Sequence, residues 1–163
     1  MSGAVRLRPI QGSDAAMLQT FFTERWGGPV AAGGGRLHRL DRLPGLIAEG
    51  PDGAIAGVVT WQIDDLDCEV VSIDAVDEGR GTGTALLEGA CAAAAAAGCR
   101  RVHLMTTNDN LRALWFYQRR GFVLCELRPN AVAGARLLKP GIPAVGDHGI
   151  PIRDEIVLER PLS

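Results

Sequence analysis

Three glycines stand close together in the middle of the chain, directly after an apolar run. They are Gly79, Gly81 and Gly83, and the run before them, residues 70–76, is rich in β-branched side chains, as a strand is. A helical, alanine-rich pattern follows and ends at Gly98. Glycines in such a turn let backbone N–H groups approach a ligand closely, and the helix directs its positive end toward the same place. The chemistry that this spacing predicts is the binding of an anion.

The glycine turn by itself leaves two interpretations open, because such a turn is often only a tight connection. A Walker phosphate loop is excluded, since neither Lys-Ser nor Lys-Thr follows the last glycine. A dinucleotide-binding fold is not favoured, because the turn lies deep in the chain and no later strand–helix unit offers the expected ribose-binding acid.

A second stretch, residues 101–122, carries polar and aromatic side chains at helical spacing. It predicts a strand at 102–106 and then a helix that runs to Arg120 and ends at Gly121. Three residues can cap this helix: Asn108, Asp109 and Asn110. One face of the helix would carry Asn110, Ala113, Leu114 and Tyr117.

Together the two stretches resemble the GNAT superfamily of acetyl-CoA-dependent N-acetyltransferases. The later motif of that family, Asn-x-x-Ala-x-x-Phe-Tyr-x-x-x-Gly-Phe, is matched here by Asn110, Ala113, Phe116, Tyr117, Gly121 and Phe122. Its pyrophosphate motif, Gln/Arg-x-x-Gly-x-Gly/Ala, is matched at Gly81 and Gly83. Glu78 stands at the opening position of that motif in place of Gln or Arg, and Arg80 can supply the lost positive charge.

The resemblance implies which residues bind acetyl-CoA. The pyrophosphate would lie on the backbone of Arg80, Gly81, Thr82, Gly83, Thr84 and Ala85. Main-chain groups of the central strand would align the thioester, at Ile73, Asp74, Ala75 and Val76. The later helix would add Asn110, Ala113 and Phe116. No metal is implied, and no cysteine is needed as an acetyl carrier.

Two side chains are expected to carry the acid–base chemistry of transfer to an amine. Tyr117, the single tyrosine of the chain, would protonate the departing thiolate. Glu69, at the start of the central strand, would take the proton of the amine, and a chain of water molecules is the alternative. Strict alternation puts Asp67 on the side of Glu69 and Asp74 on the other. A bulge after about Val71 would change those sides.

The resemblance implies an α/β fold, the GNAT fold. Its central sheet is mixed, mostly antiparallel, flanked by helices and splayed at the cofactor slot, here between about 69–76 and 101–107. Before this slot, we expect a strand at 5–9, a helix to Arg25 with an apolar stripe, a flexible loop at 26–35 and strands at 43–49 and 55–62. After it, we expect a strand at 123–127, a helix at 130–139, a loop at 141–152 and a strand at 156–159. The apolar stripe is Met17, Leu18, Phe21 and Phe22.

The length and composition of the chain fit one globular domain, residues 1–163, with 47% hydrophobic and 22% charged residues. A net charge of −2 favours neither a nucleic acid nor a membrane surface as partner. No apolar stretch is long enough to span a bilayer, and residues 1–9 lack the apolar segment of a signal peptide. The four cysteines lack metal-ligand spacing, so we expect reduced thiols and a cytoplasmic protein.

The acceptor stays open at this stage. A small-molecule amine is favoured by an acidic cluster that can line a closed pocket: Asp64, Asp65, Asp67 and Glu69. A protein N-terminus or lysine is the alternative, and Trp26 and His38 can lie on the acceptor side. A non-catalytic acyl-CoA-binding module also stays open, because Glu78 would weaken phosphate binding, although Tyr117 argues against it. A homodimer, and the role of the loop at 140–155, stay open as well.

Overall fold

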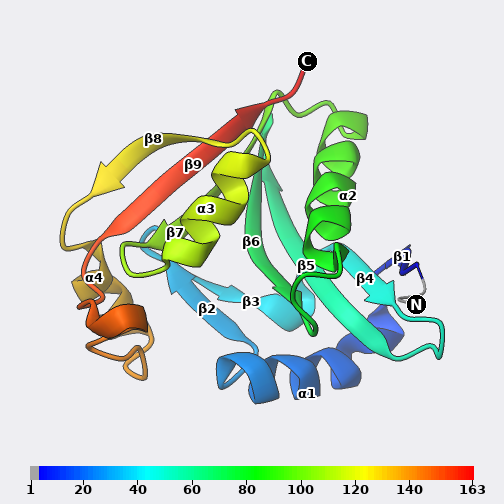
Figure 1. The fold of residues 1–163 in the computed structure, drawn as a ribbon, viewed down its shortest axis with the longest axis horizontal. Helices are drawn as coiled ribbons and strands as arrows, with labels where there is room; N and C mark the ends of the chain where they lie inside the picture. The colour runs from blue at the N-terminus through cyan, green and yellow to red at the C-terminus, as the bar shows by residue number, and fades with distance from the viewer. Residues whose placement is uncertain (1–3) are drawn as a thin grey trace. The chain divides into compact units, whose positions relative to one another are not determined.

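The computed structural model describes residues 4–163 (Figure 1). These residues fall into two compact units. The first unit comprises the chain up to Val30, then Arg39–Val102 and Leu162–Ser163. The second comprises Ala31–His38 and His103–Pro161. Each unit therefore combines segments that are far apart in the sequence.

Four antiparallel strands form the sheet of the first unit, in the order β1-β4-β5-β6. They are β1 (Arg6–Pro9), β4 (Gly45–Glu49), β5 (Ile55–Asp64) and β6 (Asp67–Ala75). Tight turns join β4 to β5 and β5 to β6. The central strand β6 begins at Asp67, earlier than the expected Val70, so its first residues pair with the end of β5.

Two helices, α1 (Ala15–Trp26) and α2 (Thr82–Ala96), cover opposite faces of this sheet. A Cβ added at Gly57 of β5 would lie 2.8 Å from Leu86 of α2, so Gly57 faces α2. Its neighbour Val58 points the other way and pairs with Asp74, whose carboxylate contacts the end of α1. Small residues let α2 lie close to the strands: a Cβ at Gly89 would be 2.7 Å from Leu46.

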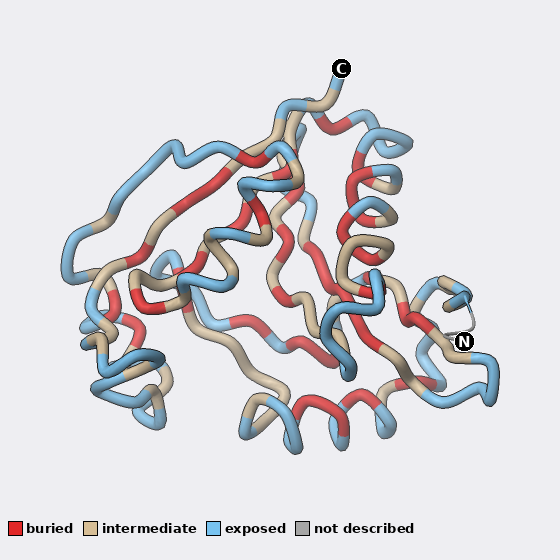
Figure 2. Tube along the Cα trace, in the orientation of Figure 1, coloured by how far each residue is buried: buried red, intermediate tan, exposed pale blue. Residues whose placement is uncertain are grey.

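Apolar side chains from both helices form the core of the first unit, and Figure 2 colours the buried positions red. The fully buried ones include Leu18, Phe22, Ile47, Val58, Val59, Leu86, Leu87 and Ala90. The predicted stripe of α1 is confirmed at Leu18, Phe21 and Phe22 but is wrong at Met17, which is 38% exposed. Helical spacing places Met17 at the border of the stripe, where spacing cannot decide burial.

The register between β5 and β6 shifts by one residue at Val71, which forms a bulge. An extra residue in one strand changes the side to which the following side chains point. Glu69 and Asp74 would lie on opposite faces of a regular strand, and the bulge puts both on the face that α1 covers. The predicted change of sides after Val71 is therefore confirmed.

The second unit contains β7 (Arg101–Thr107), β9 (Glu155–Pro161) and β8 (Val123–Arg128) in that spatial order. The first two residues of β7 belong to the first unit. Helix α3 (Leu111–Arg119) follows β7, and α4 (Ala131–Leu138) follows β8. These five predicted elements are confirmed with small differences at their ends, and β9 is longer than expected.

Residues 26–35, predicted as a flexible loop, contribute instead to a hairpin of β2 (Val30–Gly33) and β3 (Arg36–Arg39). Gly34 and Gly35 form its turn, with φ of 60° and 76°. Two successive residues with positive φ are what a tight hairpin turn requires. The pair of glycines was therefore a hairpin signal rather than a sign of flexibility.

The loop between α4 and β9 is held by polar side chains of the second unit. Asn108 Oδ1 accepts the backbone N–H groups of Arg153 and Asp154, each at 3.0 Å, and its Nδ2 donates to Pro151 O at 2.9 Å. Arg136 donates to the carbonyl oxygens of Pro143 and Ile152, at 2.7 and 2.8 Å. These bonds fix the loop within its own unit, which supports a packing role for residues 140–155, whose role the sequence left open.

Candidate functional site

The turn from β6 into α2 has the backbone geometry of an anion cradle. Gly79 and Gly81 have φ of 79° and 80°, in the left-handed region that favours glycine. A Cβ added at either would meet no atom of the described chain within 4 Å beyond its immediate neighbours, so the space beside the turn is open. The backbone at these two positions can therefore be approached closely by a ligand.

The first turn of α2 directs N–H groups toward the same space. The first bond of the helical ladder runs from Ala85 N–H to Gly81 O, at 3.0 Å. The N–H groups of Thr82 to Thr84 precede this bond, and in an α-helix such groups point out of the N-terminus along the axis. With the helix dipole they attract an anion. The predicted residues from Arg80 to Ala85 thus lie together in one turn.

Charged side chains flank the cradle. Arg80 Nε lies 4.0 Å from Asp77 Oδ2, and both side chains are well exposed. Glu78 stands between them in the sequence. Because Arg80 is paired with Asp77, its role in replacing the cation that Glu78 displaces stays a prediction.

Alternation along β6 divides the four residues that were expected to align a thioester. Val76 N–H donates to Ala56 O of the strand before, at 2.8 Å. In an antiparallel ladder, every second residue bonds to the same neighbour, so Asp74 also bonds to β5. The backbone groups of Ile73 and Ala75 point away from β5. The main-chain groups of these two residues therefore take no part in the ladder between β5 and β6.

The carboxylate of Asp74 is bound by two side chains at the end of α1. Arg25 donates from Nε and Nη2 to its two oxygens, at 2.7 Å each, and Trp26 Nε1 donates at 3.0 Å. Arg25 Nη2 also donates to Ala75 O at 3.1 Å. Sequence reasoning placed Trp26 on the acceptor side and did not identify Arg25. No sequence signal links Arg25 to an aspartate 49 residues away.

The carboxylates at the other end of β6 differ in their surroundings. Asp67 is 3.0 Å from Arg101 Nε and 3.4 Å from Arg100 Nε, and these guanidinium groups, Arg101 first, hold its pKa below the usual value. Its charge is therefore offset, which weakens its predicted part in an acidic wall. Glu69 is half-buried on the same face. The remaining members of that predicted wall are exposed: Asp64 and Asp65.

Tyr117 lies on α3 in the second unit and is 8% exposed. Its ring packs edge-on against Phe116 and Phe122, with centroids 5.3 and 5.9 Å away. Burial raises the pKa of its phenol. Among residues 4–163, no group forms a hydrogen bond with its hydroxyl. Tyr117 is thus a protonated donor with no protein acceptor in the described chain.

Asn110 is the residue that caps α3, out of the three candidates. Its Oδ1 accepts the N–H of Ala113 at 3.1 Å, so its amide NH₂ is left for a further acceptor. Asn108 instead holds the loop described above, and Asp109 accepts the Thr107 hydroxyl at 2.6 Å.

The ring of Phe116 lies under the guanidinium of Arg120, 3.8 Å from its centre. His38, predicted to lie on the acceptor side, is 7% exposed, which favours a packing role.

The described residues contain no cluster of three or more His, Cys, Asp or Glu that could hold a metal ion. Across residues 4–163, no helix has both the length and the apolar character that a membrane crossing needs. In the same part of the chain, none of the four cysteines forms a disulfide.

Comparison with known sequences identifies close relatives. The sequence model described as the Acetyltransferase (GNAT) family matches residues 16–122, which include parts of both units. The uncharacterized protein YdhI of Bacillus subtilis (strain 168) is 46% identical over 147 residues, and the match covers 90% of this chain and 92% of that protein.

Solved structures share the fold. An IAA acetyltransferase from Bacillus cereus ATCC 14579 matches with a TM-score of 0.74 at 21% identity, over 98% of this chain and all of the other. A GNAT superfamily phosphinothricin acetyltransferase from Sinorhizobium meliloti, in complex with AcCoA, matches with a TM-score of 0.69 at 18% identity, over 98% and 89%. The predicted α/β class, with a mixed, mostly antiparallel sheet flanked by helices, is confirmed. The splay of the sheet and the single domain stay predictions.

Proposed function

Since the chain belongs to the acetyltransferase (GNAT) family, we propose that it is an N-acetyltransferase that uses acetyl-CoA as donor and a primary amine as acceptor. The observation that carries this proposal is the turn at Gly79 and Gly81, which opens a helix with its N–H groups directed at open space. A pyrophosphate is the anion that such a turn suits.

The residues around the turn fit acetyl-CoA. The backbone from Arg80 to Ala85 would hold the pyrophosphate, and Ile73 and Ala75 would offer main-chain groups to the acyl-bearing arm. Acetyl-CoA bound there supplies a thioester, whose acyl carbon an amine can attack and whose thiol can leave. We further propose that the amide of Asn110 contacts the cofactor, because its carbonyl alone is used by the helix cap.

Two side chains would move the protons. Glu69 takes a proton from the acceptor, because an ammonium has no lone pair with which to attack. Tyr117 donates a hydrogen bond or a proton at the sulfur, because its hydroxyl has no acceptor among residues 4–163 and its raised pKa keeps it protonated.

We propose a small-molecule amine as the acceptor rather than a protein N-terminus or lysine. Two structural relatives are named for IAA and phosphinothricin, and this supports a compound as acceptor here. We propose a cytoplasmic enzyme, because a reducing compartment would keep its four cysteines as thiols.

Replacing Tyr117 with Phe tests the chemistry while it keeps the ring. We expect kcat to fall roughly 10- to 100-fold in a thiol-release assay with a panel of amines, because one proton donor is lost. The KM for acetyl-CoA and the free energy of unfolding should stay close to wild type, since the hydroxyl has no partner to lose in the described chain. The wild-type kcat should show no loss from Tyr117 ionisation below about pH 10, because its pKa is raised above the ordinary value.

An unchanged kcat in Tyr117→Phe would make Tyr117 a packing residue and contradict its catalytic role. A wild type that releases thiol with none of the amines, but does so with a peptide N-terminus, would overturn the small-molecule acceptor alone.

A further inference from the structure

One guanidinium group binds both a side chain and the main chain at the end of β6. Arg25 of α1 binds both oxygens of Asp74 at 2.7 Å and the carbonyl oxygen of Ala75 at 3.1 Å. Trp26, the last residue of α1, adds an indole hydrogen bond of 3.0 Å to the same carboxylate. The Asp74 side chain is only 16% exposed, so these charge-assisted bonds are partly shielded from water.

These contacts reach the main chain at the end of β6 as well as a side chain. The backbone of Asp74 bonds to β5, and Val76 N–H also donates to Ala56 O of β5, whereas the carbonyl of Ala75 points the other way. Arg25 binds this carbonyl by reaching one residue beyond the carboxylate that it pairs with. Because the two groups of one peptide unit are coplanar, Arg25 and β5 together hold the peptide unit between Ala75 and Val76 from opposite sides.

We propose that Arg25, Asp74 and Trp26 form a positioning clamp, which fixes the end of β6 in the orientation that binds the acyl donor and makes donor binding depend on α1. The clamp rests on the proposed function, because the donor is the ligand that Ile73 and Ala75 would meet. None of the three side chains is assigned to the chemical step; they act through the strand.

Electrostatics around Arg25 provide an alternative to positioning as the way in which these residues would affect donor binding. The hydrogen bond with Asp74, and after it the charges of Asp77 and Glu78, raise the pKa of Arg25, so it stays charged. Near the cradle, Arg25 and Arg80 face three carboxylates: Asp74, Asp77 and Glu78. A pure charge effect and a positioning effect predict opposite results when Asp74 is neutralised, and this makes them separable.

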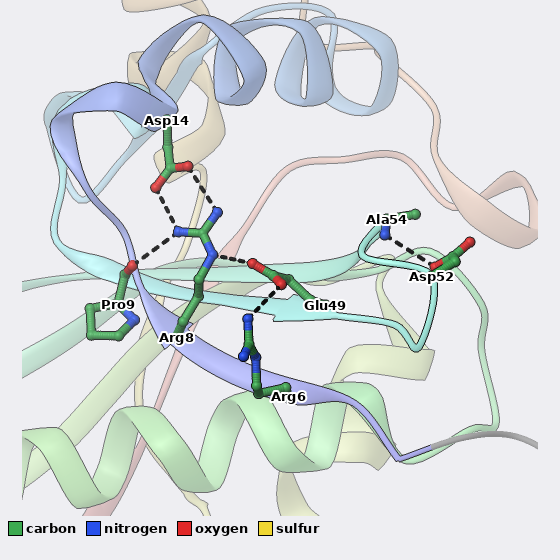
Figure 3. A network of polar contacts seen from close by, with 7 residues as sticks. All are labelled: Arg6, Arg8, Pro9, Asp14, Glu49, Asp52 and Ala54. Atoms are coloured by element: carbon green, nitrogen blue, oxygen red, sulfur yellow. Dashed lines mark hydrogen bonds and ion pairs between the residues drawn. The ribbon is translucent and has the colours of Figure 1, made fainter.

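The other end of α1 offers a matched control (Figure 3). Arg8 of β1 binds the two oxygens of Asp14 at 2.8 and 2.9 Å, just before α1 begins, and also bonds to Glu49. This pair fastens the start of the same helix to the same sheet and is also bidentate, although Arg8 uses both Nη atoms where Arg25 uses Nε and Nη2. It contacts neither the end of β6 nor the cradle.

The experiment measures the affinity for coenzyme A by calorimetry and the free energy of unfolding in urea for five proteins: wild type, Arg25→Gln, Asp74→Asn, the double variant Arg25→Gln/Asp74→Asn, and Arg8→Gln. The clamp predicts that each single variant at 25 or 74 binds about 10-fold more weakly. The double variant should bind coenzyme A no more weakly than either single variant, because each single substitution already removes the contact between Arg25 and Asp74. Arg8→Gln should lose stability but keep its affinity within about twofold.

Two results would overturn the clamp while the wild type binds coenzyme A. If Asp74→Asn binds more tightly and Arg25→Gln more weakly, the charges act without positioning. If affinities are unchanged and only the stabilities fall, the contacts are structural. A folded wild type that does not bind coenzyme A would instead overturn the proposed function, and the clamp with it.

Discussion

Strand β6 carries an ion-paired aspartate near each end of one face, and the two pairs differ in what they hold. Asp74 is bound by Arg25 of α1, which also holds the main chain beside it. Asp67 is bound by Arg100 and Arg101, which follow α2 in the sequence, and the contacts involve side chains only. The first pair can therefore orient the backbone, whereas the second offsets a charge.

This difference suggests two kinds of site along one strand. Beyond Asp74, the proposed donor site is built from backbone: glycines with positive φ, the first turn of α2, and main-chain groups of β6. Near Asp67, the proposed acceptor chemistry depends on a single carboxylate, Glu69. A backbone site depends on its glycines and on the open space beside them, whereas a single-carboxylate site depends on the chemistry of one side chain.

Replacing Glu69 with Gln should have the largest effect on turnover. We expect kcat/KM for the amine to fall about 100-fold, because the proton acceptor is lost. Asp67→Asn is the matched control on the same face of the same strand. Its carboxylate is already offset by two arginines, so kcat/KM should change less than about threefold.

Equal losses in the two variants would remove the distinction between Glu69 and Asp67. An unchanged kcat/KM in Glu69→Gln would indicate that water, rather than this side chain, carries the proton.

The pH dependence of stability should show a smaller effect at Asp67. Arg101 and Arg100 hold its folded pKa below the unfolded value, so the pair stabilises the fold above about pH 4 and the contribution is lost as pH falls through the folded pKa. Because the pair is partly exposed, we expect at most about 1 kcal/mol. Urea unfolding of wild type and Asp67→Asn should therefore differ near pH 7 and converge near pH 2. A constant difference would contradict this assignment.

The donor half of the site could be predicted from the sequence because its signals are local. Glycines at 79 and 81, the strand before them and the helix after them lie within one short stretch, and each acts through backbone geometry. The cap at Asn110 and the burial of Tyr117 follow from spacing on one helix. For the same reason, Gly34 and Gly35 could have revealed the β2–β3 hairpin.

The partners of the charged side chains could not be predicted, because they are set by contacts distant in sequence. Arg25 lies 49 residues from Asp74, and Arg101 lies 34 from Asp67. The bulge near Val71 was raised at the sequence level only as an alternative to strict alternation, because whether it forms is set by the pairing with β5 rather than by its own residue type. The roles of Asp67 and Asp74 thus became distinguishable only when the sheet and α1 were in place.

The most direct test of the donor site compares Gly81→Glu with Gly98→Glu, at the two ends of α2. Both glycines have left-handed φ, 80° and 85°, and open space at Cβ, so both variants should lose a similar roughly 1–2 kcal/mol of stability. By calorimetry, we expect Gly81→Glu to bind acetyl-CoA at least about 100-fold more weakly, since a carboxylate enters the cradle, and Gly98→Glu to bind like wild type. Equal affinities in the two variants, with a wild type that binds, would contradict the cradle as the donor site.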